Sequence, residues 1–104
     1  MTRIAKHYVR RGDVMLTATD REYEALHLVA AGLNLVEIGR IMDIDRRTVG
    51  TYIERWSSSA GVQNRTMLAV WALLTGLVTP ADIWEIWETQ VPELAAWQHA
   101  EMTP

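Results

Sequence analysis

Four helix-start signals at short intervals constrain the fold of this chain more than any other feature. Thr19 with Glu22 and Asn34 with Glu37 both match a capping box, in which two side chains satisfy the free backbone N–H groups at a helix start. Asp45 and Asn64 are N-cap residues before two further segments of helical periodicity. No strand signal in the sequence has comparable strength. The sequence therefore predicts an all-α fold, with helices over about 19–31, from 34, from 45, and from 64 to about 75.

The turn between the second and third predicted helices is very short. Only Asp43 and Ile44 precede the Asp45 cap, and two short helices joined so tightly are typical of a helix-turn-helix. In the third helix, apolar residues recur at i, i+3, i+4 and i+7, namely Val49, Tyr52, Ile53 and Trp56. This stripe predicts that one side of the helix packs on the core and leaves the other side exposed.

The two ends of the chain are less regular than its middle. Residues 1–18 fit either a frayed helix or a small hairpin around RRGD. Pro80 is well placed at a helix start, so we expect a helix near 80–90, and Pro92 predicts a break before another helix from about 92. We expect three parts: a basic arm over 1–18, a helical domain over 19–78, and an acidic, Trp-rich helical extension over 79–104.

Charge is distributed unevenly along the 104 residues, whose formal net charge is −3. Residues 1–75 hold all ten Lys and Arg and eight acidic residues, which gives +2, whereas residues 76–104 hold five acidic residues and no Lys or Arg. Exposed charges are screened beyond about 8–10 Å, so the acidic end does not prevent the basic part from binding a polyanion.

Several kinds of site and location are disfavoured by the sequence. The chain has no cysteine, and its three histidines lie far apart, so neither a disulfide nor a metal site is expected. Ser57, Ser58 and Ser59 lack a glycine elbow or an assigned base, which disfavours catalysis. The longest apolar region, at 67–78, is shorter than the roughly 20 residues that span a bilayer, and no signal peptide is visible. We therefore expect a cytoplasmic protein that has no cofactor.

From Thr19 to Val78 the chain resembles the LuxR/GerE-type, also called NarL/FixJ-type, DNA-binding domain. The resemblance rests on six motifs in the family's order and spacing: T-x-R-E-x-E, A-A-G-L-N, E-I-G-R, I-D-x-R-T-V, G-V-x-N-R and A-L-x-x-G-L-V. It implies a stand-alone four-helix helix-turn-helix domain, here with one or two extra C-terminal helices. In this family the third helix enters the major groove and the fourth commonly makes a dimer contact.

The resemblance also implies roles for individual residues. By matched position, Thr48 would touch a phosphate, Val49 and Ile53 would hold the recognition helix on the core, and Arg65 would grip the DNA backbone. Family members frequently place Lys or Arg where this chain has Gly50 and Glu54. The expected DNA-binding residues are Arg46, Arg47, Thr48, Gly50, Thr51, Glu54, Arg55 and Arg65.

The helix face opposite the apolar stripe allows alternative interpretations. Arg47 would contact a guanine and Glu54 a cytosine amino group, each worth about 1–3 kcal/mol of discrimination, whereas the alternative for Glu54 is a solvated surface residue. Gly50 costs roughly 0.5–1 kcal/mol relative to alanine, and it indicates either close approach to DNA or a partner, or a tolerated substitution. No cation lies at a helix-neighbour position of Glu54, and Arg47 and Arg55 are expected to be free for DNA.

Two further regions carry predictions about binding. The first twelve residues have a charge of +4, from Arg3, Lys6, Arg10 and Arg11, so they would lie in a minor groove as a basic arm or remain a solvated tail. The segment MLAVWALL at 67–74 is apolar on all sides and must be covered on more than one. Either the C-terminal extension folds back in cis, or a dimer forms, which we favour. The expected packing residues are Met67, Val70, Trp71, Leu74, Trp84 and Trp87.

Together these observations predict a non-enzymatic, sequence-specific transcriptional regulator of bacterial or phage origin. Its partners would be double-stranded DNA and a second copy of the chain. The alternative is a protein-interaction module of the same fold, similar to the fourth region of sigma factors or binding a protein partner through the Trp-rich tail.

Overall fold

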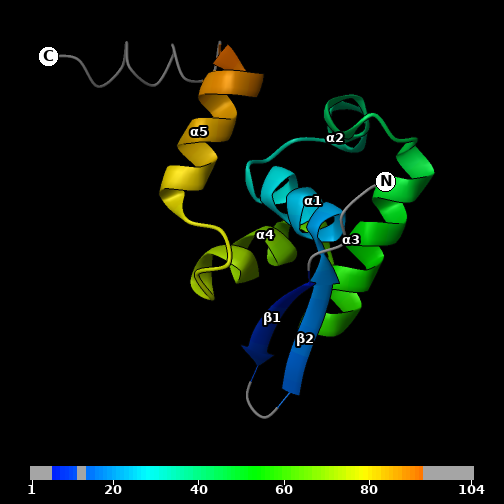
Figure 1. Ribbon diagram of the computed structural model, residues 1–104, viewed down its shortest axis with the longest axis vertical. Helices are drawn as coiled ribbons and strands as arrows, with labels where there is room; N and C mark the ends of the chain where they lie inside the picture. Colours follow the sequence, from blue (N-terminus) through cyan, green and yellow to red (C-terminus); the bar gives the residue numbers. More distant parts are fainter. Residues whose placement is uncertain (1–5, 12–13, 93–104) are drawn as a thin grey trace, which may run out of the picture.

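The computed structural model describes residues 6–11 and 14–92, which form a β-hairpin followed by five helices (Figure 1). The all-α class expected from the sequence is confirmed, with the hairpin added at its N-terminal side. The elements are β1 (Lys6–Arg11), β2 (Val14–Thr19), α1 (Asp20–Ala30), α2 (Leu35–Met42), α3 (Arg46–Ala60), α4 (Arg65–Leu74) and α5 (Pro80–Gln90).

Every helix begins at a cap that the sequence predicts. At α1 the Thr19 hydroxyl accepts from the Glu22 N–H at 3.2 Å, and the Glu22 carboxylate accepts from the Thr19 N–H at 3.2 Å. At α3 the Asp45 carboxylate accepts from the Thr48 N–H at 2.7 Å. Because a cap is satisfied by residues within one helical turn, local sequence alone specifies these boundaries.

The hairpin resolves the alternatives for the N-terminal segment. β1 and β2 pair antiparallel, with Lys6 opposite Thr19 and Arg11 opposite Val14, so this segment is not a helix. β2 ends at Thr19, which is also the cap of α1, and Ala18 belongs to the hydrophobic core. The hairpin is therefore joined to the helical body without a linker.

The core lies between α1 and the helices around it. The largest fully buried side chains come from four different helices and the segment after α4, namely Leu26, Ile38, Val49, Leu68 and Val78. Trp56 of α3 is buried as well, and its indole N–H donates to the carbonyl of Glu22 at 2.7 Å. Burial of these side chains supplies the main driving force for folding, and the indole hydrogen bond fixes α3 against the start of α1.

The turn between α2 and α3 depends on Gly39. The Ile44 N–H donates to the Gly39 carbonyl at 3.0 Å, and Asp43 adopts a left-handed conformation with φ 56°. A Cβ at Gly39 would lie 2.8 Å from the Ile44 carbonyl oxygen, closer than packed atoms approach. The absence of a side chain at this position is thus what lets the two helices meet at so tight a turn.

The C-terminal helix packs on α1 of the same chain. The Trp87 indole N–H donates to the Ala31 carbonyl at 2.8 Å, and His27 Nε2 lies 3.6 Å from an Asp82 carboxylate oxygen. Figure 1 shows α5 and α3 on opposite sides of α1. The helix expected near 80–90 is present, whereas the one expected from about 92 lies beyond the described residues. No helix in the described part is long and apolar enough to cross a membrane.

Candidate nucleic-acid interface

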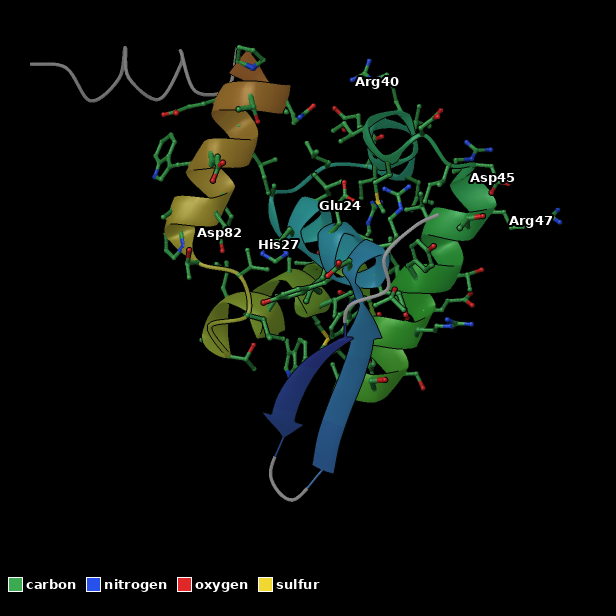
Figure 2. All side chains as sticks on the ribbon, in the orientation of Figure 1. Glu24, His27, Arg40, Asp45, Arg47 and Asp82 are labelled. Atoms are coloured by element: carbon green, nitrogen blue, oxygen red, sulfur yellow. The ribbon has the colours of Figure 1, made fainter. Side chains whose placement is uncertain are left out.

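The outward face of α3 is polar, and its inward face is fixed to the core. Val49 and Trp56 are buried, whereas Arg46, Arg47 and Glu54 are exposed. In Figure 2 Arg47 extends away from the body of the molecule at the N-terminal end of α3. The helix therefore presents a charged surface on a rigid support, as contact with a groove of DNA requires.

Cationic charge is concentrated on the first turn of α3. Neither Arg46 nor Arg47 forms an ion pair within the part of the chain that the structure describes. The backbone N–H of Thr48 lowers the pKa of Asp45, and the nearby Arg47 charge lowers it further. Asp45 therefore remains ionised as the helix cap at neutral pH, while both guanidinium groups are available to an anion.

Arg55 departs from the sequence-based expectation that it is free. Its Nη1 lies 3.6 Å from Oε2 of Glu22, with the Arg55 side chain 65% exposed and the Glu22 side chain 14% exposed. The expectation was wrong because it considered only spacing within the helix, whereas the carboxylate comes from α1. A signal was present in the sequence, since the capping box uses one carboxylate oxygen and leaves the other for a partner.

Glu54 and Gly50 both lie where the sequence placed them, on or beside the outward face. Glu54 is exposed and forms no ion pair among the described residues. A Cβ built on Gly50 meets no atom within 4 Å, so no contact inside this chain requires glycine there. Among the described residues, the space beside Gly50 is open to a molecule that approaches α3 from outside.

Arg65 lies apart from the arginines of α3. It is the first residue of α4, is exposed, and lines a shallow hollow with Gly32 and Asn34 of the α1–α2 loop. Asn34 caps α2, so Arg65 stands close to the N-terminus of that helix. The predicted cations thus come from two separate elements rather than from a single helix face.

The residues predicted to form a basic arm lie partly in the hairpin. Lys6, Arg10 and Arg11 belong to β1, whose backbone is paired with β2. Arg3 lies outside the described residues. Lys6 lies opposite Thr19, whose N–H donates to Glu22, and Glu22 contacts Arg55 of α3. The end of β1 at Lys6 therefore lies near α3.

The residues predicted for dimer or tail packing divide into two groups. Trp71 packs on Trp56 with ring centroids 6.2 Å apart, and Trp84 meets Trp87 edge to face at 5.6 Å. These tryptophans lie in cis contacts. The other three residues form a stripe along the outside of α4, where Met67 is 43%, Val70 50% and Leu74 82% exposed.

Sequence reasoning did not single out Arg40. This residue is exposed on α2, and Figure 2 shows it pointing away from the body of the protein. It adds a further cation on α2, the helix that precedes α3. The described residues contain no group of His, Asp and Glu able to hold a metal ion.

Comparisons with known proteins agree with this geometry. Residues 16–72, more than half of the chain, match the family described as bacterial regulatory proteins, luxR family. Among solved structures, the chain is similar to Vibrio cholerae VqmA, a LuxR-type receptor described as a dimer in the absence of target DNA. The identity is 30% and the TM-score 0.56, over 77% of this chain and 38% of the VqmA chain. No curated protein matches the chain. The resemblance inferred from six short motifs is thus confirmed: the chain belongs to the luxR family of bacterial regulatory proteins, which are DNA-binding regulators and not enzymes.

Proposed function

We propose that this protein is a sequence-specific transcriptional regulator that inserts α3 into the major groove of DNA as a dimer. The observation that carries the proposal is the first turn of α3, where Arg46 and Arg47 are exposed and free of ion pairs among the described residues. Val49 in that turn and Trp56 farther along α3 are both buried in the core. A preorganised cationic helix end is what binding to phosphates and base edges requires.

Within this interface we propose roles for individual residues. Arg47 contacts a guanine, and Glu54 accepts a hydrogen bond from a cytosine amino group. Thr48, Arg46 and Arg65 bind phosphates, which position the protein without carrying sequence information. Gly50 allows the helix backbone to approach the DNA closely, in agreement with the open space around it.

The hairpin extends the interface along the DNA. Its first strand carries Lys6, Arg10 and Arg11, and its root lies near the Glu22–Arg55 contact at α3. A basic strand in this place would contact the duplex beside the recognition helix. In this proposal the hairpin takes the role of the basic arm expected from the sequence.

Dimerisation is proposed through the exposed stripe of α4. Since α5 packs on α1, it leaves Met67, Val70 and Leu74 uncovered within the described part of the chain. Apolar side chains at i, i+3 and i+7 on one helix match a helix-pairing surface, and a two-fold dimer would place two recognition helices on half-sites about one DNA turn apart.

Selection of bound sequences from random duplex DNA tests the proposal as a whole. We expect a two-fold-symmetric motif with half-sites about 10 base pairs apart. Enrichment without a motif would leave only non-specific binding. A complete lack of binding at low salt would favour the alternative, a protein-interaction module of this fold.

Two substitutions separate base contacts from backbone contacts. Arg47→Ala should relax the sequence preference at one position, with a loss of about 1–3 kcal/mol for the preferred base. Arg65→Ala should weaken binding to all sequences alike and reduce the log–log salt slope by about 0.9. Equal effects of both substitutions on all sequences would contradict the proposed role of Arg47.

A further inference from the structure

Glu22 joins the start of α1 to the exposed surface of α3. Its Oε1 accepts hydrogen bonds from the Thr19 N–H at 3.2 Å and the Thr19 hydroxyl at 3.1 Å. Its Oε2 lies 3.6 Å from Nη1 of Arg55. One carboxylate therefore completes a helix cap and also pairs with a cation on the proposed recognition helix.

The Glu22 carboxylate is held in place from several sides. Its side chain is only 14% exposed, and its main-chain carbonyl accepts from the buried Trp56 indole at 2.7 Å. Trp56 is the residue next to Arg55, so both ends of Glu22 are attached to the same turn of α3. Arg55, whose side chain is 65% exposed, is the more solvent-accessible member of the pair, and Glu22 is the more buried one.

The surroundings of Arg55 differ from those of Arg46 and Arg47. Arg55 lines a shallow hollow together with Glu22 and Glu54, so two carboxylates accompany one guanidinium at this end of α3. The first turn of the helix carries two exposed arginines. The proposed interface is therefore cationic at its N-terminal end and has a partly neutralised cation toward its C-terminal end.

We propose that Glu22 is a positioning residue that sets DNA affinity: by holding Arg55, it withholds a cation from phosphates and so lowers affinity for DNA of any sequence. The inference rests on the proposed function, since it requires α3 to face DNA. Phosphate contacts increase affinity for every sequence alike, so withholding one of them lowers affinity without changing the preference among sequences.

The test is Glu22→Gln, measured by salt titration of binding to a mixed-sequence duplex. Glutamine can maintain the capping box through its carbonyl oxygen but cannot pair with Arg55. We expect tighter non-specific binding, with a log–log salt slope steeper by about 0.9, which amounts to about 3.5-fold for each fourfold change in salt. Affinity for the selected operator should rise by a similar factor, so that the preference for the operator over mixed DNA stays unchanged.

Glu24→Gln is the matched control. Glu24 lies on the same helix and pairs with Arg21 at 3.1 Å, so the substitution makes the same chemical and charge change without touching α3. A purely global charge effect would change binding equally in both variants. Equal gains for Glu22→Gln and Glu24→Gln would therefore overturn the inference.

Two explanations could account for tighter DNA binding by Glu22→Gln: release of Arg55 toward phosphates, or loss of repulsion between the Glu22 carboxylate and DNA. Combining the substitution with Arg55→Ala distinguishes them. Arg55→Ala alone should leave the salt slope for mixed DNA unchanged, because Arg55 is held away from phosphates in the unaltered protein. In that background Glu22→Gln should no longer increase affinity. A gain that persists without Arg55, or a slope that falls when Arg55 alone is removed, contradicts the proposal.

Failure of this inference can be distinguished from failure of the proposed function. If neither the unaltered protein nor any variant binds duplex DNA at low salt, both proposals fall. If the unaltered protein selects an operator but Glu22→Gln behaves as Glu24→Gln does, only the role of Glu22 is wrong. Should Glu22→Gln unfold, as judged by thermal melting, the exposed Arg55→Ala variant still tests the inference.

Discussion

At the scale of the residue, two glycines in neighbouring helices serve different purposes. Gly39 lies where any Cβ would meet the Ile44 carbonyl at 2.8 Å, whereas the space around Gly50 is open to 4 Å. Both are helical glycines in the helix-turn-helix, and the sequence does not distinguish them. Their surroundings do, which makes substitution by alanine a matched pair of tests.

Gly39→Ala should destabilise the protein. The added methyl group pushes against backbone rather than against a flexible side chain, so the turn must shift at a cost of about 1–3 kcal/mol. Urea unfolding of the variant beside the unaltered protein gives this difference. An unchanged free energy of unfolding would show that the turn tolerates the methyl group.

Gly50→Ala should have the opposite effect on stability. Alanine restricts the unfolded chain and meets no atom in the folded one, so the free energy of unfolding should rise by about 0.5–1 kcal/mol. DNA affinity should nevertheless fall, since the methyl group occupies space proposed for the duplex. Affinity equal to that of the unaltered protein would identify Gly50 as a tolerated substitution.

At the scale of the element, the caps determine where helices begin, and one of them makes stability depend on pH. The Thr48 backbone N–H lowers the pKa of Asp45. The contribution of the Asp45 cap to folding stability is therefore complete above the ordinary aspartate pKa of about 3.9. It is lost as the pH falls through the lower pKa that Asp45 has in the folded state. α3 thus keeps its cap under all neutral conditions.

Asp45→Asn tests this dependence against Asp45→Ala. Asparagine caps a helix about as well as aspartate but does not titrate, whereas alanine does not cap. At pH 7 the alanine variant should be clearly less stable than the other two proteins. The stability lost between pH 5 and strongly acidic conditions should be smaller in both variants than in the unaltered protein. If the free energy of unfolding fell equally with acidification in all three proteins, the role of Asp45 would be contradicted.

The docking of α5 is a property of contacts between elements. Trp87→Phe removes the indole donor and leaves the Ala31 carbonyl without its 2.8 Å partner, so we expect a loss of about 0.5–1.5 kcal/mol in unfolding free energy. DNA affinity should stay unchanged, because α5 and α3 lie on opposite sides of α1 (Figure 1). A parallel loss of DNA affinity would show that α5 acts on the interface.

At the scale of the whole molecule, the proposed dimer rests on the exposed stripe of α4. Leu74→Ser removes its most exposed member, and light scattering at high micromolar concentration should show a shift from dimer to monomer. Val36→Ser is the control, since Val36 is 60% exposed on α2 and lies outside the stripe. A monomer before any substitution would refute the proposed dimer.

Much of the helical framework follows from the sequence alone. Capping boxes at Thr19 and Asn34, the Asp45 cap and the stripe ending at Trp56 predicted where the helices begin and which side of α3 is buried. These signals act within one or two helical turns, so no distant residue is needed to interpret them. The sequence did not decide between a helix and a hairpin for the N-terminal segment. The strands of a hairpin satisfy each other's backbone hydrogen bonds only once they are paired.

Contacts between residues far apart in the chain were decided only by the tertiary structure. The sequence by itself determined that α3 is a capped, two-sided helix with arginines on its first turn. It did not show that Glu22 holds Arg55, that Trp87 attaches α5 to α1, or that the other described residues leave the outer stripe of α4 exposed. Each of these depends on which helix surfaces meet after folding, and periodicity within one helix carries no information about the side chains that a neighbouring helix places beside it.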